Sequence, residues 1–406
     1  MKITKMSLVA ALLVGSSAFA IDNVKVSGDA KVYYTTSDAN QDLFDSNLLN
    51  GANESAAQAA ASLSISADLT EGISAGTKVT ALSTLGLEGQ LVNNVWEGTN
   101  GVSDSFIVND LWIAATAGKT TAKVGRMELD TPLVFTEKWS IVENTFEAAV
   151  VINQDIPSTT LVGAFVGGSN GQYAGATDGT VVPGLGSIGI ANVVQGPTNE
   201  TTFNQFYNGA YAVGAINNSW EPLTVQAWYY DATHIAQAYW LQADLAMEGF
   251  LVGAQYTGTD LQDSGLTADA GTAYAVMLGY SMKDVFTAKL SYSGTSADAG
   301  AGFNLAGSGQ SKLYTEAWWN YGYVTSADTT SYNLTVEAPI AEVVDLGLYY
   351  TAADHNADNN AGDLAELTLT ASKTFGPLDT SLVYSNIKLG DADAYNQVQA
   401  YLTYNF

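Results

Sequence analysis

The chain has 406 residues, of which 47% are hydrophobic and 11% aromatic, and its formal net charge is −27. The strong negative charge argues against nucleic acid as a partner, because phosphates would be repelled, and the apolar content argues against a disordered chain. The absence of cysteine removes a disulfide framework and a thiolate metal site from consideration.

The first 20 residues have the pattern of a secretory signal. Lys2 and Lys5 form a basic start, an apolar run extends from Leu8 to Val14, and Ala18-Phe19-Ala20 matches a small-x-small cleavage site. Residues 21–406 are then expected to form one domain. The apolar run is too short to span a bilayer as a helix, and no later stretch holds ~20 unbroken apolar residues, so no transmembrane helix is expected.

Apolar and polar residues alternate along most of the remaining chain. Between Ser62 and Leu69, for example, Leu63 and Ile65 share one face with Leu69 while the serines share the other. This period of two predicts β-strands. Candidate strands begin near residues 24, 57, 73, 105, 120, 146, 159, 206, 222, 235, 249, 271, 284, 330, 343, 363, 377 and 394.

The lengths of the connections distinguish between two all-β folds. Connections after even-numbered strands are short, as at Glu71-Gly72, whereas most of those after odd-numbered strands are long, namely residues 37–56, 84–104, 127–145, 168–205 and 294–329. A soluble sandwich gives no reason for this pattern, which is typical of outer-membrane barrels. Since only helices and closed barrels can span hydrocarbon, we expect an all-β transmembrane antiparallel β-barrel of 18 strands, with 16 as the alternative.

The long connection before Phe146 has an unusual composition. It contains Pro132, Phe135 and Trp139, and is therefore too apolar for a disordered linker and too long for a hairpin turn. We expect this third external loop to fold into the barrel and narrow its bore. The charged residues expected at the constriction are Lys123, Arg126, Glu128, Asp130, Glu137, Lys138, Glu143 and Glu147.

The acids of this loop predict a preference for cations. Rings of charged side chains bias ion selectivity, and low-dielectric walls strengthen their field. Lys123, Lys138 and Arg126, the only arginine of the chain, would form the opposing positive edge. The alternative, that these acids are solvated loop residues, stays open.

The chain ends in a strand with an aromatic last residue. In VQAYLTYNF, the residues Leu402, Tyr404 and Phe406 lie on the apolar face. Such an end is typical of barrels that the assembly machinery inserts into the outer membrane. Together with the signal, it predicts that the protein lies in the outer membrane of a Gram-negative bacterium.

The signal, the alternation and the terminal Phe406 resemble Gram-negative porins over the whole of residues 21–406. More narrowly, Gly125-Arg126, the turn from Leu129 to Pro132 and the segment from Asn144 to Glu147 resemble the third-loop region of OprD-type porins and of Campylobacter-like major outer-membrane porins. The resemblance implies a homotrimer. OprD-type porins also resemble one another in a ladder of lumen arginines, which a chain with one arginine lacks.

Residues that would indicate catalysis or metal binding are scarce. The two histidines, His234 and His355, fall outside any Ser/His arrangement, so we expect no enzyme activity, no cofactor and no metal. The acidic loop from Asp354 to Asp363 departs from a calcium loop, because Asn359 replaces the glycine and Ala365 the closing glutamate.

Two functions agree with these features. The first is a water-filled channel for passive diffusion of ions and small hydrophilic solutes across outer-membrane lipid. The alternative is a surface adhesin or receptor, anchored by its barrel, that displays residues 168–205 and 294–329 as external loops.

Overall fold

A computed structural model describes residues 22–39, 43, 56–83, 105–138, 141–170, 204–233, 236–261, 270–307, 309–340, 343–356 and 362–406. The expected signal, residues 1–20, lies outside these ranges, as do Trp139 and His234. In the described part of the chain, no helix has the length and apolar character needed to cross a membrane.

Strands account for most of the described residues. They are β1 (Asp22–Ser37), β2 (Ala56–Thr70), β3 (Ile73–Ser83), β4 (Ser105–Ala117), β5 (Thr120–Met127), β6 (Phe146–Asn153), β7 (Thr159–Ser169), β8 (Asn204–Trp220), β9 (Leu223–Ala232), β10 (Ala236–Met247), β11 (Phe250–Leu261), β12 (Gly271–Met282), β13 (Phe286–Thr295), β14 (Thr329–Ile340), β15 (Val344–His355), β16 (Leu364–Phe375), β17 (Leu378–Leu389) and β18 (Tyr395–Asn405). A short 3₁₀ helix, η2 (Tyr323–Thr325), precedes β14.

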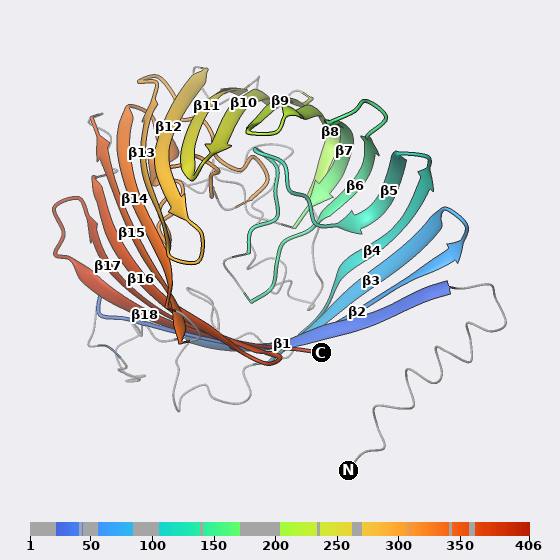
Figure 1. Cartoon of the computed structure of the whole chain (residues 1–406), viewed down its shortest axis with the longest axis horizontal. Helices are drawn as coiled ribbons and strands as arrows, with labels where there is room; N and C mark the ends of the chain where they lie inside the picture. The colour runs from blue at the N-terminus through green and yellow to red at the C-terminus, as the bar shows by residue number, and fades with distance from the viewer. Residues whose placement is uncertain are drawn as a thin grey trace, which may run out of the picture.

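The strands form one closed antiparallel sheet. Each strand pairs with its neighbours in the chain, and β1 pairs with β18, so that Tyr33 lies opposite Tyr401. Figure 1 looks into the resulting barrel. The predicted 18 strands are confirmed over the alternative of 16, and every strand begins within two residues of its predicted start.

The outer face of the barrel exposes large apolar side chains, whereas many polar side chains are buried inside it, the reverse of a soluble protein. Leu278 and Leu290 are 64% and 60% exposed, whereas Thr257 and Gln399 are fully buried inside the barrel. The alternation read from the sequence therefore assigns the faces correctly, including Leu369, which is exposed on β16. An outer face of this kind is typical of a sheet surrounded by lipid.

The chain terminus closes the barrel against β1. The Phe406 backbone N–H donates to the carbonyl oxygen of Gly28 over 2.9 Å, and the Gly28 N–H donates to the carbonyl oxygen of Phe406 over 2.8 Å. A β-carbon at Gly28 would lie 2.6 Å from Phe406 Cζ, so the ring occupies the space that any side chain at position 28 would need. Leu402, Tyr404 and Phe406 are all exposed on the outer face.

Candidate functional site

The connection between β5 and β6 lies inside the barrel (Figure 1). Met127 and Phe146, at its two ends, are buried in an apolar cluster with Val166 of the barrel wall. At its tip, Pro132 occupies a tight turn that is closed by a 3.1 Å hydrogen bond from Thr131 N–H to the carbonyl oxygen of Val134.

The tip of this loop contacts the barrel wall at β9 and β10. Leu133 is fully buried, and its N–H donates to the Tyr230 hydroxyl of β9 over 3.3 Å. The Leu133 side chain belongs to the same apolar cluster as Trp228 and Trp240 of β9 and β10. An apolar turn thus fixes the loop to a wall of aromatic residues.

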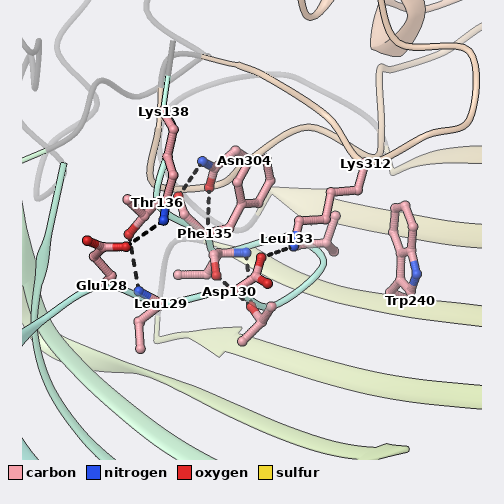
Figure 2. Close-up of polar contacts among 12 residues, drawn as sticks. Glu128, Leu129, Asp130, Leu133, Phe135, Thr136, Lys138, Trp240, Asn304 and Lys312 are labelled. Atoms are coloured by element: carbon pink, nitrogen blue, oxygen red, sulfur yellow. Dashed lines mark hydrogen bonds and ion pairs between the residues drawn. The ribbon is translucent and has the colours of Figure 1, made fainter. Parts of the chain in front are cut away.

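A second loop, between β13 and β14, also folds inward and joins the first. Asn304 Nδ2 donates to Glu137 Oε1 over 2.9 Å and to the carbonyl oxygen of Phe135 over 2.8 Å, as Figure 2 shows for Phe135. The Leu305 N–H donates to the carbonyl oxygen of Leu133 over 2.8 Å. The prediction that residues 294–329 form an external loop is therefore wrong for the described residues of this segment.

Buried polar groups of the wall hold the second loop in place. Glu366 of β16, 1% exposed, accepts the backbone N–H groups of Trp319 over 2.8 Å and of Asn320 over 2.9 Å. Gln255 of β11 donates to the carbonyl oxygen of Lys312 over 2.9 Å. The alternation assigns Glu366 to the polar face of its strand, but no local pattern connects it with residues about 47 positions away.

Glu143 anchors the return arm of the first loop. Its carboxylate lies 2.9 Å from Lys31 Nζ of β1 and 3.1 Å from Lys78 Nζ of β3, and its side chain is 12% exposed. Burial by itself would raise the pKa of Glu143, but the attraction of Lys78 and Lys31 outweighs it and lowers the pKa to about 2. Neither lysine was among the predicted site residues.

Glu128 and Asp130 are also paired with lysines. Glu128 lies 2.7 Å from Lys138 Nζ and 3.7 Å from Lys78 Nζ. Lys312 reaches from the second loop to Asp130, and its Nζ lies 4.8 Å from the centroid of the Phe135 ring (Figure 2). The hydrogen bond to Glu128 raises the pKa of Lys138.

Glu137 is buried between the two loops at 1% exposure. It therefore connects the loops rather than lining open space. The loop acids that were expected to produce a negative field are thus either paired with lysines or enclosed.

Lys123, Arg126 and Glu147 occupy different faces of the barrel. Lys123 faces inward, with its Nζ 4.4 Å from the centroid of the Trp112 ring. Arg126 and Glu147 are cross-strand partners 3.2 Å apart, and Arg126 also lies opposite Leu111 of β4, which is 62% exposed on the outer face. Cross-strand partners share a face of the sheet, so Arg126 and Glu147 lie on the outer face instead of at the predicted constriction.

The space left between the loops and the wall of β17 and β18 is a cavity of about 760 Å³. Both loops contribute charged and aromatic side chains to it, and Ser381 and Tyr401 contribute from the opposite wall. The described residues contain no group of histidine, aspartate and glutamate side chains arranged to hold a metal ion. The described residues of the two loops leave this cavity unfilled.

Solved structures with the same architecture include outer-membrane proteins of Pseudomonas and Acinetobacter. The crystal structure of OpdK from Pseudomonas aeruginosa with vanillate superimposes with a TM-score of 0.70 at 14% identity, over 95% of this chain and 98% of that one. OccAB4 from Acinetobacter baumannii gives a TM-score of 0.73 at 13% identity, over 95% and 98%.

The chain has the fold of the OprD/Occ outer-membrane porins. OccK8 (OprE) from Pseudomonas aeruginosa, another OprD/Occ structure, is similar over 95% of this chain with a TM-score of 0.70 at 13% identity. No family model and no curated protein matches the sequence. The resemblance to Campylobacter-like porins stays a prediction.

Proposed function

We propose that the protein is an outer-membrane porin: a water-filled channel for the passive diffusion of ions and small hydrophilic solutes. The observation that carries the proposal is the open cavity of about 760 Å³ that remains beside two inward-folded loops in a barrel with an apolar outer face. Water-filled interiors are typical of porins, whereas other outer-membrane barrels have plugged interiors. The OprD/Occ fold agrees with this function.

The alternative function, an adhesin or receptor, requires residues 168–205 and 294–329 to be displayed outside the barrel, and the second of these two loops is not. Residues 296–307 and 309–328, in the β13–β14 connection, are tied to Glu366 and Gln255 of the wall and face the bore. Most of the other proposed display loop, residues 168–205, lies outside the described residues. No described feature favours adhesion.

The proposed location is the outer membrane of a Gram-negative bacterium, reached through the assembly machinery that reads the strand ending in Phe406. Outer-membrane lipid then surrounds the exposed Leu278 and Leu290. A homotrimer is the assembly that the porin resemblance implies.

Cation preference also belongs to the proposal, on a different basis from the one the sequence suggested. The net charge of −27 gives the whole molecule a negative field, while the constriction acids are offset by Lys31, Lys78, Lys138 and Lys312. We therefore expect the preference to be modest and to fade at 1 M salt, where the Debye length is ~3 Å.

Planar bilayers and liposomes test the function directly. The purified protein should conduct KCl and allow liposomes to swell in small sugars or amino acids. A protein that inserts, shows heat-modifiable mobility and still fails to conduct would refute the porin proposal. Under a KCl gradient, an anion-selective reversal potential would refute the cation preference alone.

A further inference from the structure

Aromatic rings line the cavity from three parts of the chain. The first loop contributes Phe135, the second contributes Trp318, Trp319 and Tyr321, and β18 contributes Tyr401. The rings of Trp319 and Tyr321 stand nearly perpendicular with centroids 6.2 Å apart. A solute in this cavity therefore meets aromatic surface both on the loops and on the wall.

Two ion pairs open into the same cavity. Glu128 pairs with Lys138 and Asp130 pairs with Lys312, and all four side chains line it. Asp130 is 89% exposed and Lys138 is 65% exposed. By contrast, Glu143 is 12% exposed between its two lysines and does not line the cavity.

Exposed ion pairs are weak and exchange partners readily. A solute with a single charge can replace only one member of such a pair and leaves the other without a counter-charge. A solute with both charges can satisfy the carboxylate and the ammonium together. Aromatic rings next to these pairs attract a solute ring by stacking or edge contact and attract an ammonium group by cation–π interaction.

We infer that this cavity selects small zwitterions that carry an aromatic or other apolar group, of the chemical kind of an aromatic α-amino acid. Glu128 and Asp130 receive the ammonium group, Lys138 and Lys312 receive the carboxylate, and the rings of Phe135, Trp318 and Trp319 receive the side chain. The inference rests on the proposed porin function and names the solute class of that same bore.

Four probes separate the contributions of charge and ring. L-Phenylalanine carries both charges and a ring, 3-phenylpropanoate lacks the ammonium, phenethylamine lacks the carboxylate, and L-alanine lacks the ring. Single wild-type channels in planar bilayers should show transient current blockades by each. We expect blockades by L-phenylalanine to last about tenfold longer than those by the other three, a difference of about 1.4 kcal/mol.

Variants assign each contribution to its residues. Glu128→Gln with Asp130→Asn should shorten L-phenylalanine blockades to the level of 3-phenylpropanoate, and Lys138→Gln with Lys312→Gln should shorten them to the level of phenethylamine. Trp318→Ala with Trp319→Ala should remove the advantage over L-alanine. Lys373→Gln is the matched control, because Lys373 lies on the outer face of β16, beside Phe375, and its loss should leave the order of the probes unchanged.

The wild type decides whether the channel selects this solute class, and a set of variants that all keep the wild-type order of the probes would overturn the assignment of the selectivity to these residues. A channel that conducts KCl but holds L-phenylalanine no longer than 3-phenylpropanoate, phenethylamine or L-alanine overturns the inference and leaves the porin proposal intact. A protein that inserts and does not conduct KCl overturns the porin proposal itself.

Discussion

Replacing Glu143 by glutamine should loosen the first loop and destabilise the barrel measurably. The change leaves Lys78 Nζ, which lies 3.1 Å from Glu143, without its closest carboxylate, and among the described residues it leaves Lys31 with Asp29 at 3.8 Å. Removing one member of a buried ion pair costs about 3–5 kcal/mol. The pKa shift from 4.5 to about 2 gives a similar figure, about 3 kcal/mol, at 1.36 kcal/mol per pKa unit.

The lowered pKa of Glu143 also determines how the stability of the folded protein depends on pH. A carboxylate whose folded pKa lies below its unfolded pKa stabilises the folded state above the unfolded value, and that contribution disappears as pH falls through the folded value. For Glu143 the stabilisation is complete above about pH 5 and is lost between about 4.5 and 2. The wild type should therefore lose stability over this range, whereas Glu143→Gln should lack this part of the loss.

Denaturant titration of the protein refolded into phospholipid vesicles measures both effects. The matched control is Glu128→Gln: its closest partner, Lys138 at 2.7 Å, is 65% exposed, and Lys78 lies farther away at 3.7 Å, so its loss should cost less than about 1 kcal/mol. If Glu143→Gln cost no more than Glu128→Gln at pH 7, or if the two proteins followed the same curve from pH 5 to pH 3, the anchoring role of Glu143 would be refuted.

Three further predictions concern the wall and the closure of the barrel. Leu290→Arg on the outer face should cost ~2–4 kcal/mol if residue 290 lies near the bilayer midplane. Ser64→Arg on the inner face should be tolerated. Equal costs in a refolding titration would contradict the face assignment. Gly28→Val should prevent β1 from closing against Phe406. The control Gly163→Ala should assemble normally, because a β-carbon there meets nothing within 4 Å. Heat-modifiable gel mobility distinguishes the two variants, and normal mobility of Gly28→Val would count against this closure of the barrel. The Glu366 carboxylate accepts the N–H groups of Trp319 and Asn320 at 2.8 and 2.9 Å. Glu366→Gln should release these two residues and increase the open-channel noise. A current trace identical to that of the wild type would show that Glu366 does not hold the second loop.

The strands were predictable because their signal is local. A period of two needs only neighbouring residues, and each face of a lipid-embedded sheet meets a uniform environment. The inward direction of the first loop was predictable for the same reason. Pro132, Leu133 and Phe135 are near neighbours in the sequence and are too apolar for a loop exposed to solvent. The segment from Ala317 to Tyr323, with Trp318, Trp319 and Tyr321, carried the same signal for the second loop and was overlooked because the whole connection was treated as external.

The partners of the charged residues were not predictable in this way. Lys31 is 112 positions from Glu143, and Lys78 is 65 positions away. Such pairs depend on where a closed sheet brings its walls together, which a single sequence does not encode as a pattern. Arg126 was misplaced for a smaller reason: β5 continues to Met127 instead of ending at Gly125, so Arg126 keeps the outward direction of Val124.

The two loops also act on the barrel as a mechanical object. A cylinder one sheet thick resists stretching along its hydrogen bonds but flattens easily into an oval. Leu133 holds the first loop against β9, and Glu143 holds it against β1 and β3. Gln255 and Glu366 hold the second loop against β11 and β16. These contacts connect the loops to the wall in several directions and should keep the barrel round. Removing one contact by substitution should let lateral pressure in the membrane deform the cross-section, and the cavity would then change shape with the surrounding lipid.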